Sequence, residues 1–382
     1  MSAIVDQFLG WAQRAPVVGR AGAARALARA YLTSDLSAAE REKIETAMTV
    51  LLDDSAVEVR LVLADALARS EHAPAHIVMT LATDAEPVAL IVAEHSPVIL
   101  DSELVDMVAM RGETMQIAIA SRPFLSRAVS AAIGEVGTAA ACLTLVGNRG
   151  ARLPRFSLDR IVARHGDCPE LRVALLERRD LPLDVREVLL GRLAKALRDL
   201  VVSHGWTTPE RAAAVTEDAR ECATIAASFE APADNLPALV AQLIQGKALT
   251  PAFLIRAVAA GQTLLFETAL AMLAKVPQER VAALVASGRS GNLRALLQKA
   301  SLPPATFPAF AAAIDVIRNG DPLAGGESDY RRATHIIDAI VTRYQRRPDR
   351  ELDQIMALLR RFARDAKRNA ARDYAEQVRE AA

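Results

Sequence analysis

Aromatic residues, cysteine and net charge are all scarce in this chain of 382 residues. Phenylalanine, tryptophan and tyrosine together make up 4% of it, which argues against a β-sheet fold because strands are enriched in aromatic residues. The three cysteines, Cys142, Cys168 and Cys222, have neither the even number of a disulfide framework nor the spacing of a zinc site. Equal numbers of basic and acidic residues, 46 of each, create no global field that would attract nucleic acid or an anionic membrane.

Long apolar runs and nucleotide motifs are missing as well. No stretch of 18 uncharged apolar residues occurs, so no membrane span is predicted. Residues 1–14 have no basic region followed by a long apolar core, which a signal peptide would need. A phosphate-binding loop, a dinucleotide-binding glycine motif and a nucleophile elbow are all absent. We therefore expect a cytoplasmic protein with no metal, no cofactor and no catalytic constellation.

Alanine and aliphatic residues are what the chain has in abundance. Apolar residues make up 52% of the sequence, and alanine is the best helix former. Between Val57 and Ala68 the apolar positions cover one broad helical face rather than alternating. The sequence thus predicts an all-α fold.

A short apolar helix that ends in a polar group recurs along the first half of the chain. Consecutive polar endings are 26, 27, 26 and 30 residues apart, and a second helix fits between each pair of them. A two-helix unit of this length cannot bury its own apolar face, so neighbouring units must stack. We predict an α-solenoid of short, HEAT-like helix pairs. The polar residues that end the units are Arg69, His95, Arg122, Asn148 and Arg178.

The repeat is lost after residue 182. A longer helix is predicted up to Val202, and the run His204–Pro209 reads as a loop followed by another helix. We therefore divide the chain into a helical cap with HEAT-like repeats over 1–202, a connecting region over 203–235 and a second helical lobe over 236–382.

Several runs resemble a known bacterial family. They are A-E-H-S-P-V-I-L from Ala93, I-A-S-R-P-F-L-S from Ile119, L-V-G-N from Leu145, L-L-E-R-R-D-L-P from Leu175, G-Q-T-L-L-F-E-T-A-L-A-M-L from Gly261 and N-L-R-A-L-L-Q-K-A-S-L-P from Asn292. In order and spacing, over roughly 50 to 320, they look like the family called domain of unknown function 2336. The resemblance implies a helical, HEAT-like fold. It implies no reaction and no catalytic residue.

The five polar endings form a predicted ladder with two interpretations. In the structural one, each side chain donates to carbonyl groups at a helix C-terminus or to the neighbouring repeat. In the functional one, the ladder is a recognition stripe for an acidic segment or an anion, since arginine offers bidentate contacts.

Three other groups are candidate chemical sites. His72 and His76 stand four residues apart, as zinc ligands on a helix do, but Pro74 between them places His72 before the helix. His165, Asp167 and Cys168 cluster at a helix junction, where a capped turn is the simpler interpretation. Cys142 falls on an apolar helix face and is predicted to be a core residue.

These patterns favour a non-catalytic scaffold that binds a protein partner, in a setting such as bacterial signalling or regulation. One alternative is a nucleic-acid-binding HEAT-like protein. Residues 331–382 carry 13 basic and 8 acidic residues, but interleaved acids and few aromatics favour a solvated helix face. The other alternative is an enzyme with a site assembled across repeats, for example around His165 and Cys168. The alanine-rich helices could also pack against a second copy of the chain.

Overall fold

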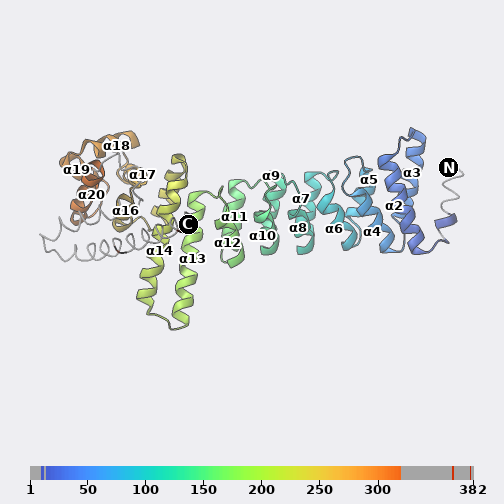
Figure 1. The fold of residues 1–382 in the computed structure, drawn as a ribbon, viewed down its shortest axis with the longest axis horizontal. Coiled ribbons are helices and arrows are strands. Elements are labelled where there is room, and N and C mark those ends of the chain that lie inside the picture. The colour runs from blue at the N-terminus through green and yellow to red at the C-terminus, as the bar shows by residue number, and fades with distance from the viewer. Residues whose placement is uncertain (1–9, 13, 320–363, 365–378, 380–382) are drawn as a thin grey trace. The chain divides into compact units, whose positions relative to one another are not determined.

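A computed structural model describes residues 10–12, 14–319, 364 and 379 of the chain (Figure 1). These residues form helices joined by loops, and their one piece of β-structure is an isolated parallel bridge between Leu125 and Ala151. The predicted all-α class is confirmed. No helix in the described part combines the length and the apolar character needed to cross a bilayer.

The chain divides into two compact units, Met1–Arg179 and Asp180–Ala382. This division differs from the predicted domains 1–202, 203–235 and 236–382. The predicted connecting region contains the whole of a long helix, α14 (Pro209–Glu230), which packs against α13 (Leu183–Ser203), the helix before it. Because α13 also packs against α15, both long helices belong to the second unit.

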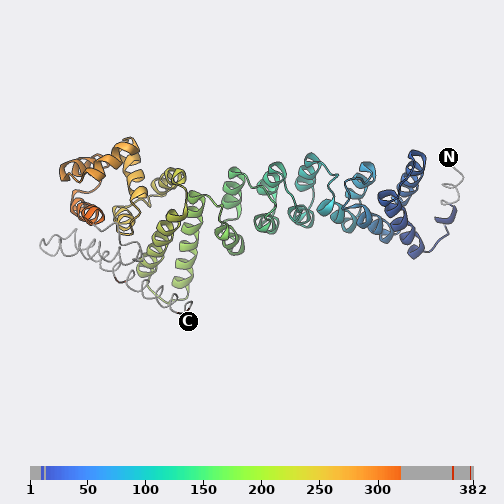
Figure 2. The same cartoon turned by 45° about the horizontal axis from the view of Figure 1, so that its top comes forward.

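In the first unit, alternate helices pack against each other. One row runs from α2 through α4, α6, α8 and α10 to α12, and a second runs from α7 through α9 to α11 (Figures 1 and 2). This is the packing expected of stacked helix pairs; the solenoid and HEAT-like assignment stays a prediction. The helices are α2 (Val17–Thr33), α3 (Ala38–Leu51), α4 (Val57–Leu67), α5 (Ala75–Ala82), α6 (Glu86–His95), α7 (Asp101–Met110), α8 (Glu113–Ala120), α9 (Arg127–Val136), α10 (Ala139–Gly147), α11 (Arg155–His165) and α12 (Pro169–Glu177).

Local sequence explains why these helices are short. Ser37 and Glu40 form a capping box at the start of α3, and the hydroxyl of Thr138 accepts the backbone N–H of Ala141 at the start of α10. Pro74 and Pro154 stand immediately before α5 and α11, where a missing N–H costs nothing. Each short helix buries a few aliphatic side chains against the next repeat.

The second unit is built on longer helices and a larger aromatic core. Phe253, Phe266 and Phe310 are its largest buried side chains, and the rings of Phe266 and Phe310 stack with centroids 5.4 Å apart. Its helices are α13, α14 (Pro209–Glu230), α15 (Leu236–Gln245), α16 (Pro251–Ala259), α17 (Thr263–Ala274), α18 (Gln278–Ser287), α19 (Ser290–Lys299) and α20 (Phe307–Asn319), with short 3-10 helices at Ala233–Asn235 and Pro304–Thr306.

Candidate functional site

Three of the five ladder residues link consecutive repeats through backbone carbonyls. Arg122 follows α8 and donates to the carbonyl oxygens of Ala93 and, at 2.6 Å, Ser96, at the end of α6. Asn148 follows α10, and its Nδ2 donates to the carbonyls of Ala120 (2.8 Å) and Arg122 (2.7 Å). These donors satisfy carbonyl groups that a helix C-terminus leaves without intrahelical partners.

Arg178 continues the same arrangement after α12, where its Nη1 donates to the carbonyl of Val146 at 2.8 Å. The other two ladder residues do not join it. Arg69 is exposed and lies 3.5 Å from Asp65 on its own helix, and the ring of His95 is closest to the neighbouring Glu94. Arg122, Asn148 and Arg178 therefore act as the structural interpretation predicts, while a binding role for the ladder stays a prediction.

A second set of links, which the sequence reasoning missed, joins the first repeats through carboxylates. Arg20 on α2 holds Asp54 in a bidentate pair, with Nε to Oδ2 at 2.6 Å and Nη2 to Oδ1 at 2.9 Å. Arg60 on α4 holds Asp84 with the same geometry. The hydrogen bond from the arginine is the main reason that the pKa of each aspartate is lowered. The sequence carried one signal for these links: an aspartate recurs shortly before α4 and before α6, as Asp54 and Asp84.

The side chains considered for metal binding or catalysis contact other groups rather than one another. The ring of His165 bonds to the carbonyl of Gly137 at 3.1 Å, whereas the thiol of Cys168 points to Glu170 at 3.1 Å. His76 contacts Glu45 and Thr49 instead of His72. Within the described ranges, no three His, Cys, Asp or Glu residues are grouped as metal ligands would be.

Cys142 is fully buried, as predicted, and burial raises the pKa of its thiol to about 11. The basic segment 331–382 lies outside the described residues apart from Arg364 and Arg379.

In the first unit, large apolar side chains are exposed in two loops and at the start of α11. Leu100, before α7, is 64% exposed, Phe124, before α9, is 71% exposed, and Phe156, at the start of α11, is 63% exposed. The guanidinium of Arg152 lies over the Phe124 ring, 5.9 Å from its centroid. We call Leu100, Phe124, Arg152 and Phe156 the loop edge.

Hydrogen bonds hold the three loops together. The Leu125 N–H donates to the carbonyl of Gly150 and the Arg152 N–H to that of Leu125, at 3.3 and 3.2 Å. Arg122 ties the same region to Ser96 in the loop before α7. Hydrogen bonds therefore link the three backbone segments next to these exposed apolar side chains.

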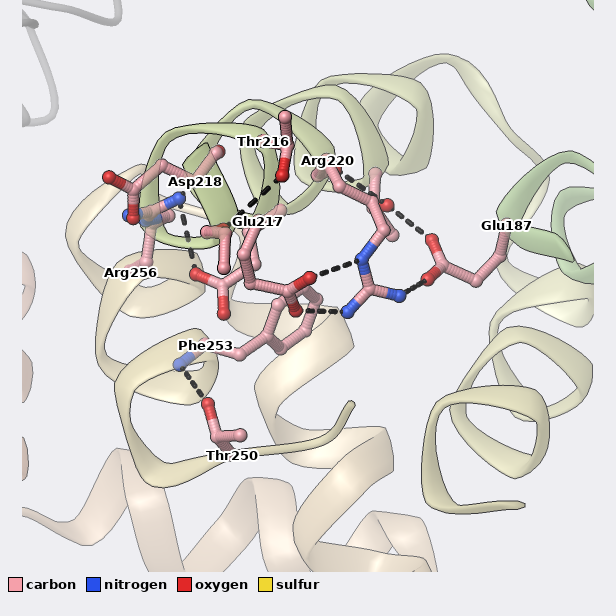
Figure 3. Close-up of polar contacts among 11 residues, drawn as sticks. Glu187, Thr216, Glu217, Asp218, Arg220, Thr250, Phe253 and Arg256 are labelled. Carbon is pink, nitrogen blue, oxygen red and sulfur yellow. Dashed lines mark hydrogen bonds and ion pairs between the residues drawn. The ribbon is translucent and has the colours of Figure 1, made fainter. Parts of the chain in front are cut away.

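The second unit contains a buried network of charged side chains (Figure 3). Arg220 on α14 donates to Glu187 on α13, which is 4% exposed, and to Glu217 one turn away. The second oxygen of Glu187 accepts the hydroxyl of Thr224. Burial is the main reason that the pKa of Glu187 is raised.

The network continues from α14 to α16 through Arg256. Its Nη2 donates to Asp218 Oδ1 at 2.8 Å, its Nη1 donates to the Asp218 carbonyl at 2.8 Å, and Nη1 lies 3.1 Å from Glu221 Oε2. Burial raises the pKa of Glu221 to about 7 and outweighs the opposing effect of Arg256. Three helices are thus joined through carboxylates in the interior.

Comparisons with known proteins place the chain in a family. No curated protein and no solved structure is significantly similar to it. The family model described as "Uncharacterised protein conserved in bacteria (DUF2336)" matches residues 88–350, which is more than half of the chain. That region covers the loop edge and the whole charged network. The chain therefore belongs to the bacterial family of domain of unknown function 2336.

Proposed function

We propose that this protein is a non-catalytic scaffold that binds a protein partner through the loop edge of the first unit. The observation that carries the proposal is the exposure of Leu100, Phe124 and Phe156 on loops that hydrogen bonds connect. Scattered exposed apolar residues are ordinary on a protein surface, but clustered ones mark interaction sites. The repetition of the feature in successive repeats fits a surface that extends along stacked helix pairs.

The chemistry of the loop edge indicates what kind of partner it would bind. Aromatic side chains and arginine supply a large share of binding energy at protein interfaces. Arg149 and Arg152 are exposed in the loop that follows α10, and Arg152 lies over the Phe124 ring. A partner segment with apolar side chains and nearby carboxylates would complement both features.

Two observations favour binding over catalysis. His165 and Cys168, which sequence reasoning considered for a site across repeats, bond to different groups. Arg122, Asn148 and Arg178 use side-chain nitrogens for links within the chain. The apolar side chains of the loop edge are exposed instead.

The test is affinity capture with the intact chain, followed by binding measurements with the purified partner. Substituting Phe124, Arg152 and Phe156 together by alanine should weaken the partner's affinity at least tenfold, as expected when interface anchors are truncated. The matched control is Met110→Ala, because Met110 is 82% exposed but lies at the end of α7, away from these loops.

Equal affinity of the triple variant and the wild type would contradict the proposal. Capture of the partner only when nucleic acid is present would also contradict the proposal. An electrophoretic shift of single-stranded DNA that the triple variant loses would instead assign the aromatic and arginine side chains to stacking on bases.

A further inference from the structure

A groove in the second unit lies between α13, α14 and the turn that joins α15 to α16. Two adjoining cavities of about 280 and 330 Å³ form it. Both are lined by Gly191 and Lys195 on α13, Arg220 on α14, and Gly246 and Ala248 at the turn. Together they reach the size range of small-molecule sites.

The groove has an excess of positive charge. Lys195, Arg198 and Lys247 line one of its cavities, and Arg192 lines the other. Its two carboxylates, Glu187 and Glu217, are both held by Arg220. By contrast, the side-chain ammonium groups of Lys195 and Lys247 have no hydrogen-bonding or ion-pair partner within the described part of the chain. Two ammonium groups, from different elements, are therefore available to an anion.

The backbone keeps Lys247 in a conformation that suits glycine better. Its φ is 55°, in the left-handed region that usually holds glycine after a helix. The glycine of this turn, Gly246, stands one residue earlier at φ −76°, which any residue adopts. A lysine thus occupies the left-handed position beside the groove, and Lys275 and Ser301 have the same conformation at the ends of other helices.

Gly191 keeps the groove open where helix stability would favour another residue. It lies inside α13, where glycine costs about 0.5–1 kcal/mol relative to alanine. A Cβ atom added there would meet no atom within 4 Å, so helix packing does not require glycine at this position. A longer side chain would project into the groove that Gly191 lines.

We infer that this groove binds a small ligand that carries a phosphate or pyrophosphate group. Lys195 and Lys247 contact the anion from α13 and from the turn, and Arg198 adds charge. Lysine suits phosphate because it is a compact point charge with several donors. A doubly charged group also matches the two unpartnered ammonium groups better than a single carboxylate does. This inference is independent of the loop edge in the first unit.

The test measures binding of inorganic pyrophosphate to the full chain by calorimetry, and by thermal stabilisation against sodium chloride of equal ionic strength. Saturating pyrophosphate should raise Tm, because a ligand that binds only the folded state stabilises it. Lys195→Ala and Lys247→Gly should each weaken binding about tenfold, the loss expected for one charge-assisted hydrogen bond.

Lys247→Gly is the sharper variant because glycine suits the backbone and keeps the fold. Its matched control is Lys275→Gly, since Lys275 has φ 52° at the end of α17 and does not line the groove. The control should bind pyrophosphate within about twofold of wild type. Gly191→Leu should block binding by filling the groove.

Absence of pyrophosphate binding by the wild type would overturn the inference. Equal losses in Lys247→Gly and Lys275→Gly would also overturn it, because they would show a general charge effect. Full binding by Gly191→Leu would place the anion elsewhere.

Discussion

The carbonyl ladder of the first unit and the charged network of the second join their helices with different chemistry. In the first unit, Arg122, Asn148 and Arg178 donate to backbone carbonyls at helix ends, in addition to its two arginine–aspartate pairs. In the second, Arg220 and Arg256 are held by buried carboxylates on neighbouring helices. Arginine is the main donor in both the ladder and the network, and their acceptors differ.

The choice of acceptor decides how each unit responds to mutation and pH. A helix C-terminus offers unpaired carbonyls with a partial negative charge, and these groups do not titrate. A buried carboxylate carries a full charge, is costly to leave unpaired and can take up a proton. The first unit's carbonyl ladder should therefore be insensitive to pH near neutrality, and the second unit should be the more vulnerable to loss of one arginine.

The largest effect is expected from Arg256→Met. The change leaves Glu221 and Asp218 without their cation, and removing one partner of a buried ion pair costs about 3–5 kcal/mol. Urea unfolding followed by circular dichroism should show this loss at pH 8. It should be smaller at pH 5, where Glu221 is protonated and no longer needs a counter-ion.

Arg280→Met is the matched control, because Arg280 is exposed on α18. It should change the free energy of unfolding by less than about 0.5 kcal/mol. Equal losses in the two variants would mean that the interior network contributes nothing specific to stability.

An intermediate effect is expected from Arg122→Ala in the first unit. The carbonyls of Ala93 and Ser96 lose a charged donor in a buried place, which costs about 2–3 kcal/mol. Arg69→Ala, at the exposed end of the predicted ladder, should cost less than about 0.5 kcal/mol. Thermal and urea unfolding of both variants checks the difference. If Arg122→Ala leaves stability unchanged but abolishes partner binding, the structural interpretation of the ladder is wrong.

The contrast between Arg122 and Arg69 shows what sequence spacing can predict. The periodicity placed a polar residue after each of these helices. The donors that follow α8, α10 and α12 reach the previous helix of the same row. Arg69 makes no such link because α2 has 17 residues whereas α4 has 11. The Arg20–Asp54 pair ties the two helices near their starts, so the end of α2 extends about 9 Å beyond Leu67, the end of α4, at 1.5 Å per residue.

His95 makes no link to the previous helix for a different reason. It is the last residue of α6, whereas Asn148 and Arg178 each follow the last residue of their helix. The equivalent position is Ser96, which is fully buried. The lengths and ends of the helices therefore decide which ladder residues join consecutive repeats. Propensity defines these ends only to within a residue or two.

The charged network left no comparable signal in the sequence. Glu187, Arg220 and Arg256 lie on three helices with no repeat to relate them. Only packing shows that these side chains are buried together, since each helix alone has ample exposed positions for a charge. The change of rhythm near residue 182 predicted a longer helix up to Val202, and α13 runs from Leu183 to Ser203.

The smallest effect concerns pH and Glu221. Its pKa is about 7 in the folded chain against an ordinary value of 4.5, chiefly because of burial. The folded state therefore binds this proton more tightly than the unfolded state. The resulting stability is fully present below about pH 4.5 and is lost as pH rises through about 7. Between pH 5 and 7 this group should lower the free energy of unfolding by about 2 kcal/mol.

Glu221→Gln keeps the shape of the side chain and removes its titration. The variant should lose less stability than the wild type between pH 5 and 7 in urea unfolding, whereas Glu279→Gln, on the exposed start of α18, should follow the wild type. Parallel pH profiles for Glu221→Gln and wild type would show that the buried carboxylate does not set the response. A flatter profile would mean that the buried carboxylate, and not the arginine, makes the charged network respond to pH.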